Sequence, residues 1–176
     1  MDGEQEKTYE EKLVNRFFES VNSKTGTAMR AAFKKADNPD TEYQCWEYLA
    51  YYGVNLEYPE KRLPYITVFS SIANSDRSTD GSLKFGKALL VAYDSDIESE
   101  PARARLRRVL ACDSTEDVCK ILRSVLRFIN SKSVAISYAS LLKELKYFDI
   151  APEKIKAGWA QQFYEIILEK NKEDKK

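Results

Sequence analysis

The sequence has 176 residues, of which 43% are hydrophobic and 32% are charged, and its formal net charge is +0; this composition excludes a disordered chain and indicates a soluble globular protein. It contains no histidine, which excludes Ser-His and Cys-His nucleophiles, histidine acid–base catalysis and His-ligated zinc. No apolar run approaches the roughly 20 residues of a membrane span, and the charged N-terminus is unlike a signal peptide, so we expect a cytoplasmic protein without a membrane partner.

The first two predicted helices lie before residue 38. A capping box formed by Thr8 and Glu11 predicts where the first helix begins. Thr27 begins a short basic helix, which stops at Asn38-Pro39. The apolar face of the first helix consists of Leu13, Val14, Phe17, Phe18 and Val21.

A third predicted helix is rich in aromatic residues. We expect Asp40 or Thr41 to cap it and Gly53 to end it. Aromatic side chains can stack with bases, but at helical spacing they more often build a core, and we favour the core interpretation. The residues concerned are Tyr43, Trp46, Tyr48, Tyr51 and Tyr52.

A fourth predicted helix, from Leu63 to Ala73, is apolar and has Pro64 in its first turn. The polar stretch 74–81 is expected to be a surface loop, and Ser82 is expected to cap a fifth helix. The acidic run 94–100 follows that helix. Because it lacks the glycine and the terminal Glu of a calcium loop, we interpret it as a linker and not as a metal site.

Residues 101–130 are the stretch around which the rest of the chain is organised. They predict two helices, with Pro101 at the first position of one and Ser114 capping the other after the turn 112–114. The second helix has one buried apolar stripe. That stripe consists of Val118, Ile121, Leu122, Val125, Leu126 and Ile129.

The same two helices concentrate positive charge. Lys120, Arg123 and Arg127 have i, i+3, i+7 spacing and therefore form a column on one face of the second helix. From Arg103 to Lys132, eight bases face three acids, although the whole chain is neutral. A solvated helix surface explains most arginine-rich helices; the alternative is a face that contacts phosphates.

The last two predicted helices begin at Ser133 and at Ala151-Pro152. The final helix has a predicted buried face of Ile155, Trp159, Phe163, Ile166 and Ile167. We therefore expect an all-α protein of two small helical-bundle lobes packed in tandem. The lobes are residues 8–93 and 101–168, with the acidic linker 94–100 between them and flexible tails at 1–7 and 169–176.

No catalytic constellation is visible in the sequence. The residues Cys45, Cys112 and Cys119 form no CxxC pair, and we expect them to be small core residues. No carboxylate cluster lies in a context typical of an active site. We therefore expect no enzymatic activity, no catalytic residue, no cofactor, no metal site and no small-molecule substrate.

Five blocks, in order, carry a likeness to a known family. They are Gly26-x-Ala28-x-Arg30 with Lys34-Lys35, Gly86-Lys87-Ala88-Leu89, Arg105-Leu106-Arg107-Arg108-Val109-Leu110-x-x-Asp113 followed by the leucine-rich helix with Arg123, Ile136-x-Tyr138-Ala139-x-Leu141-Leu142-x-x-Leu145, and Trp159-Ala160-x-x-Phe163-Tyr164. Together they resemble the CasB-type small subunit of the type I-E CRISPR effector complex, Cascade, whose second block is Gly-Arg-Ala-Leu. The likeness covers nearly the whole chain.

The resemblance implies a non-catalytic subunit of a crRNA-guided complex of antiviral defence. Such a subunit supports the crRNA–target DNA heteroduplex and the displaced DNA strand, beside other Cascade subunits and a second copy of itself. Because base pairing reads the sequence, the protein needs only a cationic surface. By motif position, the resemblance implies nucleic-acid contacts for Arg30, Lys87, Arg105, Arg108 and Arg123, and local charge alone adds Lys34, Arg103, Lys120 and Arg127.

Other functions are compatible with the same residues. In a helical protein–protein adaptor, the basic face would bind an acidic partner; salt-dependent binding of single-stranded nucleic acid but not of acidic polypeptides would exclude it. A helix-turn-helix regulator fits less well, because residues 130–132 lack the usual glycine and the following helix is not basic.

Overall fold

The computed structural model describes residues 6–165 and 167. Within them the chain forms only helices, turns and one isolated backbone bridge, so the prediction of an all-α protein is confirmed. The helices are α1 (Tyr9–Asn22), α2 (Thr27–Ala36), the 3-10 helix η1 (Pro39–Cys45), α3 (Trp46–Tyr51), α4 (Pro59–Ala73), α5 (Phe85–Val91), α6 (Glu100–Leu110), α7 (Thr115–Ser131), α8 (Tyr138–Lys146) and α9 (Pro152–Phe163). None of these helices is long and apolar enough to cross a membrane.

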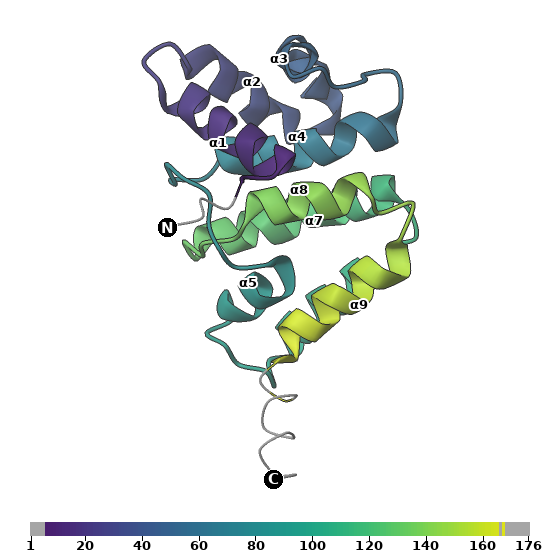
Figure 1. Ribbon diagram of the computed structural model, residues 1–176. Coiled ribbons are helices and arrows are strands. Elements are labelled where there is room, and N and C mark those ends of the chain that lie inside the picture. The colour runs from purple at the N-terminus through teal and green to yellow at the C-terminus, as the bar shows by residue number, and fades with distance from the viewer. Residues whose placement is uncertain (1–5, 166, 168–176) are drawn as a thin grey trace.

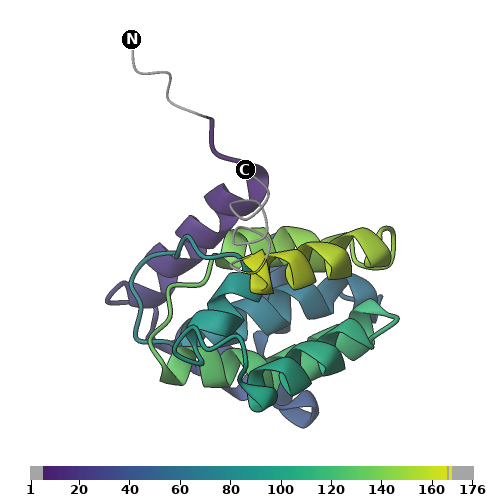
Figure 2. The same cartoon turned by 90° about the horizontal axis from the view of Figure 1, so that it is seen from below.

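Three layers follow one another in Figure 1. Helices α1 to α4 form the upper layer, α7 and α8 the middle one, and α5 and α9 lie below, with α6 behind α9. Figure 2 shows this lower side of the molecule directly. Because α5 packs against α9 and α6, residues on both sides of the acidic run 94–100 share one layer, and the division into two lobes at that run stays a prediction.

Helix α4 is the centre of the molecule. It contacts α1, α2, α7 and α8, and every residue from Pro64 to Ala73 is buried, as expected of a helix that is apolar on all sides. The prediction that it begins at Leu63 was wrong, because Pro59 takes the start of the helix and Pro64 lies in its interior. Pro64 removes only the hydrogen bond to the Glu60 carbonyl, close to the helix start.

The upper layer contains an aromatic core. The Phe17 and Phe69 rings stack with centroids 4.0 Å apart, and Phe33 packs edge-on against Phe17 at 4.9 Å. Of the aromatic helix, Trp46, Tyr48 and Tyr52 pack against this core, which confirms the core interpretation for them. It was wrong for Tyr43 and Tyr51, which are 60% and 76% exposed.

The cap predicted for this aromatic segment was also wrong. Asn38, not Asp40 or Thr41, precedes the first helical turn, and its side chain accepts a hydrogen bond from the Asp40 N–H. Pro39 begins a 3-10 helix there.

All three cysteines are buried, and burial raises the pKa of Cys45 and Cys119 to about 12. Both therefore remain thiols at neutral pH, and the core prediction is confirmed.

Two helix starts were mispredicted because distant backbone segments pair with each other. The Gly81 N–H donates to the Ile136 carbonyl at 3.1 Å, the Leu83 N–H to Ala135 at 3.0 Å, and the Ser137 N–H to Leu83 at 2.7 Å. This pairing holds residues 81–83 and 135–137 extended. Helix α5 consequently begins after Lys84 and not after Ser82, and Ser137, not Ser133, caps α8.

The predicted surface loop 74–81 is anchored at Asp80. Its carboxylate accepts hydrogen bonds from the Tyr138 and Ala139 N–H groups, at 2.7 and 3.1 Å, and so satisfies the first turn of α8. Burial raises the pKa of Asp80, and those backbone hydrogen bonds offset part of that rise. The loop is therefore part of the framework between the upper and middle layers.

Helix α9 closes the lower layer. Trp159 and Phe163 are fully buried, as predicted, and a Cβ on Gly86 of α5 would lie 2.0 Å from the Trp159 carbonyl oxygen, so only glycine permits this approach. Ile155 is half-buried, whereas Ile167 lies beyond the helix and is exposed, so its predicted burial was wrong. Ile166 and the tail 169–176 lie outside the described residues, as do residues 1–5 of the N-terminal tail.

Candidate nucleic-acid interface

The three basic residues predicted to form a column on α7 lie in three different environments. The cap and the apolar stripe of this helix are as predicted: the Ser114 hydroxyl accepts from the Asp117 N–H, and the stripe is buried except for the half-buried Ile121. The stripe faces α4 and the neighbouring helices. On the outer side Lys120 is exposed, whereas the side chain of Arg123 is 10% exposed and that of Arg127 is 64% exposed.

Arg123 belongs to a buried ion-pair network. One oxygen of Glu42 in η1 lies 3.5 Å from the Arg123 guanidinium, and the other accepts a hydrogen bond from Arg62 of α4 at 3.1 Å. Arg123 also donates to the Asp37 carbonyl at 2.8 Å, and Arg62 lies over the Trp46 ring. The guanidinium of Arg123 therefore joins α7 to the upper layer, with one carboxylate between two arginines.

Arg127 and Lys34 lie near the end of α2. Arg127 is 3.5 Å from the Asp37 carboxylate and still mostly exposed. Lys34, one turn before Asp37, is exposed, and no carboxylate among residues 6–165 and 167 pairs with it. Both side chains can reach an anion.

The side chain of Arg30 is hydrogen-bonded within the protein. Its guanidinium donates to the Ala73 carbonyl at 2.9 Å, to the Val21 carbonyl at 3.3 Å and to the Asn22 side chain at 2.7 Å. These acceptors lie at the C-terminal ends of α4 and α1, where helices carry unsatisfied carbonyl groups and partial negative charge. Arg30 therefore satisfies two helix ends.

Lys87 and Arg103 are engaged in ion pairs. Lys87 lies 3.6 Å from Glu165. Arg103 pairs with Glu98 of the acidic run at 2.6 Å and donates to the Ile97 carbonyl at 2.9 Å. The neighbouring Arg107 pairs with Glu100. The acidic run thus neutralises one side of α6.

Arg105 stacks on aromatic rings. Its guanidinium carbon lies 4.3 Å from the Phe128 ring centroid and 5.9 Å from that of Tyr93. Arg105 and the two rings are half-buried. Lys132 lies over the same Phe128 ring at 5.7 Å. This arrangement joins α6 to α7 by cation–π contacts.

Two open grooves flank Lys120. One, of about 390 Å³, is lined by Arg108, Cys112, Asp113, Asp117 and Lys120 among others; the second, of about 330 Å³, is lined by Lys120, Arg123, Arg62 and Glu116 among others. The structure therefore brings together four basic residues along the start of α7.

The acids and bases of the first groove differ in their partners. Asp113 pairs with Lys156 at 3.3 Å, and Asp117 accepts from the Ser114 hydroxyl at 2.8 Å. Arg108 and Lys120 are exposed and have no ion-pair partner within the described part of the chain. The surface here therefore offers two free cations.

Sequence reasoning missed Arg62 and gave Lys132 no role beyond its charge. The prediction of α4 from Leu63 onwards left Arg62 in a loop, whereas the true start at Pro59 places it in the first turns of the helix. Pro59, preferred at a helix start, was the available signal. Metal-binding groups of three or more His, Cys, Asp or Glu side chains are absent from residues 6–165 and 167.

Comparison with known proteins identifies the family. The model of CRISPR-associated protein Cse2 matches residues 29–164, whereas no curated protein matches. The crystal structure of TTHB189, a CRISPR-associated protein of the Cse2 family from Thermus thermophilus, has a TM-score of 0.68 at 20% sequence identity, over 90% of this chain and 99% of that one; at this identity the likeness shows the fold. The resemblance found in the sequence motifs is confirmed: the chain belongs to the CRISPR-associated Cse2 family, the CasB small subunit of type I-E Cascade.

Proposed function

We propose that this chain is a non-catalytic, cytoplasmic, nucleic-acid-binding subunit of Cascade in antiviral defence. It supports the crRNA–target DNA heteroduplex and the displaced DNA strand through its basic helical face, beside other Cascade subunits and a second copy of itself. The observation that carries the proposal is the pair of exposed cations Arg108 and Lys120 at the grooves along the start of α7, neither of which has an ion-pair partner among residues 6–165 and 167.

Eight of the nine basic residues implied by the sequence divide into two roles under this proposal, and Arg105 combines both. The exposed residues Lys34, Arg108, Lys120 and Arg127 contact phosphates. The residues Arg30, Lys87, Arg103 and Arg123 hold the face in shape through their contacts with carboxylates and carbonyls. Arg105, stacked on Phe128, joins the two helices that carry the face and presents a planar cation on which a base can stack.

Such contacts fit a protein that does not read sequence. Cations along a helix neutralise backbone phosphates and release counterions whatever the bases are. In RNA-guided complexes sequence specificity comes from base pairing, and the protein tracks the backbone. We accordingly expect no base preference in the contribution of Arg108 and Lys120, and no cleavage of bound nucleic acid in the presence of divalent metal.

Charge reversal tests the proposal in the assembled complex. Arg108→Glu with Lys120→Glu should weaken binding of every target sequence and flatten the logarithmic salt dependence by about 0.7 to 0.9 for each lost phosphate contact. The matched control is Lys7→Glu with Lys24→Glu, which makes the same charge change at exposed sites beside α1. Binding is measured against salt concentration after equal assembly has been verified.

Two results would contradict the proposal. Equal affinities and equal salt slopes for both double variants would leave the basic face as a solvated surface. Loss of binding to polyglutamate with unchanged binding to DNA would favour the adaptor function instead.

A further inference from the structure

A third groove lies away from the basic face. It has a volume of about 460 Å³ and is formed by α8, α9 and the residue before α5. It shares no residue with the grooves at Lys120. Its apolar wall comes from Tyr147, Ile150 and Ile155, and its polar rim from the three lysines Lys84, Lys143 and Lys154 with Glu144.

The wall of this groove is apolar and open to solvent. Ile150 is 75% exposed and Tyr147 is 48% exposed, and Ile155 adds a half-buried aliphatic side chain. The turn that follows α8 holds Ile150 outward, since its N–H donates to the Tyr147 carbonyl at 3.0 Å. A cluster of exposed apolar side chains rimmed by polar ones is typical of a protein-binding site.

The rim carries positive charge. Lys84, Lys143 and Lys154 come from three different segments, and all are exposed. None of them pairs with a carboxylate within residues 6–165 and 167. Three free lysines around an apolar wall favour an occupant with acidic groups on either side of an apolar side chain.

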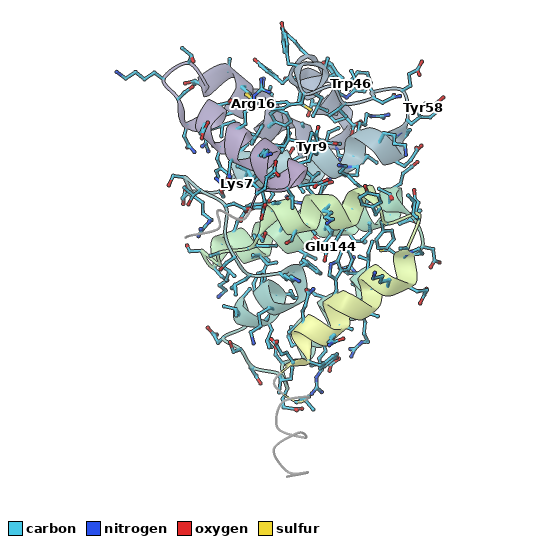
Figure 3. All side chains as sticks on the ribbon, in the orientation of Figure 1. Lys7, Tyr9, Arg16, Trp46, Tyr58 and Glu144 are labelled. Carbon is cyan, nitrogen blue, oxygen red and sulfur yellow. The ribbon has the colours of Figure 1, made fainter. Side chains whose placement is uncertain are left out.

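A half-buried carboxylate lies in the same groove. Glu144, labelled in Figure 3, projects from α8, and its Oε2 accepts a hydrogen bond from Trp159 Nε1 of α9 at 2.8 Å. A nucleic-acid phosphate has no hydrogen-bond donor for this carboxylate, whereas a peptide segment brings a backbone N–H at nearly every residue. The groove therefore favours protein over nucleic acid.

The acidic run 94–100 of a second copy of this chain is not expected to bind in the groove. Glu98 and Glu100 are already paired with Arg103 and Arg107 of the same chain, and Ile97 packs against the core. A second copy would have to break these contacts before it could insert the run. The acidic run of a second copy is therefore not the occupant of the groove.

We propose that the groove between α8 and α9 docks an acidic segment with a bulky apolar side chain from another protein subunit of the complex. The apolar side chain packs on Tyr147 and Ile150, and the acidic groups pair with the rim lysines. This inference does not depend on the nucleic-acid contacts at Arg108 and Lys120, because assembly of the complex and DNA binding are measured in separate experiments.

The test co-expresses the full chain with the remaining Cascade subunits and crRNA, and measures the fraction of the chain retained in the complex. Ile150→Glu, and separately Lys143→Glu with Lys154→Glu, should weaken retention about tenfold, as expected when a central contact of an interface is lost. Tyr51→Glu is the matched control, because Tyr51 is 76% exposed but lies on α3. The helix content of each variant is verified by circular dichroism.

A photo-crosslinking residue in place of Ile150 identifies the occupant in a complex that is otherwise wild type. A crosslink to an acidic segment with an apolar residue in another subunit supports the proposal. A crosslink to nucleic acid, to a basic segment or to a second copy of this chain overturns it. Normal retention of both groove variants without any crosslink overturns it as well.

Discussion

Two stretches of the basic face that lie one turn apart on α7 have opposite surroundings. At Lys120 and Arg108 the charges are exposed and without an ion-pair partner in the described part of the chain, whereas at Arg123 and Arg62 they are buried around Glu42. In the sequence, Lys120 and Arg123 belong to one column with helical spacing. The difference arises because Glu42 of η1, held by Arg62 of α4, pairs with Arg123 and not with Lys120. A column of charge in a sequence therefore does not indicate which cations are free to bind.

Substitution at Arg123 is the strongest test of this difference. Arg123→Met should lower the free energy of unfolding by about 3 kcal/mol, at the lower end for a broken buried pair because Arg62 still holds Glu42. Lys120→Met should change it by less than about 0.5 kcal/mol, as is usual at exposed sites. Urea unfolding followed by circular dichroism measures both; equal destabilisation would remove the distinction between the two stretches.

A second buried ion pair, between α1 and α8, should also stabilise the fold, and its contribution to the free energy of unfolding should depend on pH. Lys146 donates to Glu10 at 2.6 Å, and the two side chains are 22% and 9% exposed. Burial by itself raises the pKa of Glu10, but the hydrogen bond and charge of Lys146 outweigh it and bring the pKa below 4.5. Burial by itself lowers the pKa of Lys146, but the hydrogen bond to Glu10 outweighs it and brings the pKa above 10.5.

The sign of the pH effect follows from these directions. The depressed Glu10 pKa stabilises the fold above pH 4.5 and ceases to do so as the pH falls through the folded-state value. The raised Lys146 pKa stabilises it below pH 10.5 and ceases to do so as the pH rises through the folded-state value. Relative to wild type, Glu10→Gln should therefore cost about 1–2 kcal/mol near neutral pH and less in acid. A difference that is independent of pH would contradict the assignment.

The smallest expected effect concerns Arg105, which stacks on Phe128 beyond both stretches of α7. Phe128→Leu keeps an apolar side chain against Tyr93 but removes the ring beneath Arg105 and Lys132. We expect a loss of about 0.5–1 kcal/mol per cation–π contact at such a half-exposed site. The double-mutant cycle with Arg105→Met measures the coupling, and a coupling of zero would show that Arg105 is held by α6 alone.

Local signals in the sequence were sufficient for much of the fold. The Thr8–Glu11 capping box, the Ser114 cap and the apolar stripe of α7 all depend on residues within a few turns of one another, and they were predicted correctly. The starts of α5 and α8 depend on backbone pairing between 81–83 and 135–137. No local pattern contains that pairing, so both starts were misplaced.

The candidate site was less predictable for the same reason. Charge and motif position selected Arg30 and Arg123 as readily as Arg108 and Lys120. What separates them is the identity of distant neighbours: the carbonyl of Ala73 for Arg30, and Glu42 for Arg123. Exposed Ile150 gave no signal either, because an aliphatic residue shortly after an amphipathic helix is ordinarily assigned to the core.

The close contact between α5 and α9 also bears on the order in which the chain can fold during synthesis. Gly86 of α5 needs the Trp159–Phe163 segment against it, and Phe85 packs on the Trp159 ring. The ribosome makes α9 last among the described helices. Helix α5 can therefore pack against α9 only after α6, α7 and α8 have also been synthesised. Until then the apolar side chains of α5 that face α9 remain in water, which makes this part of the nascent chain prone to aggregation.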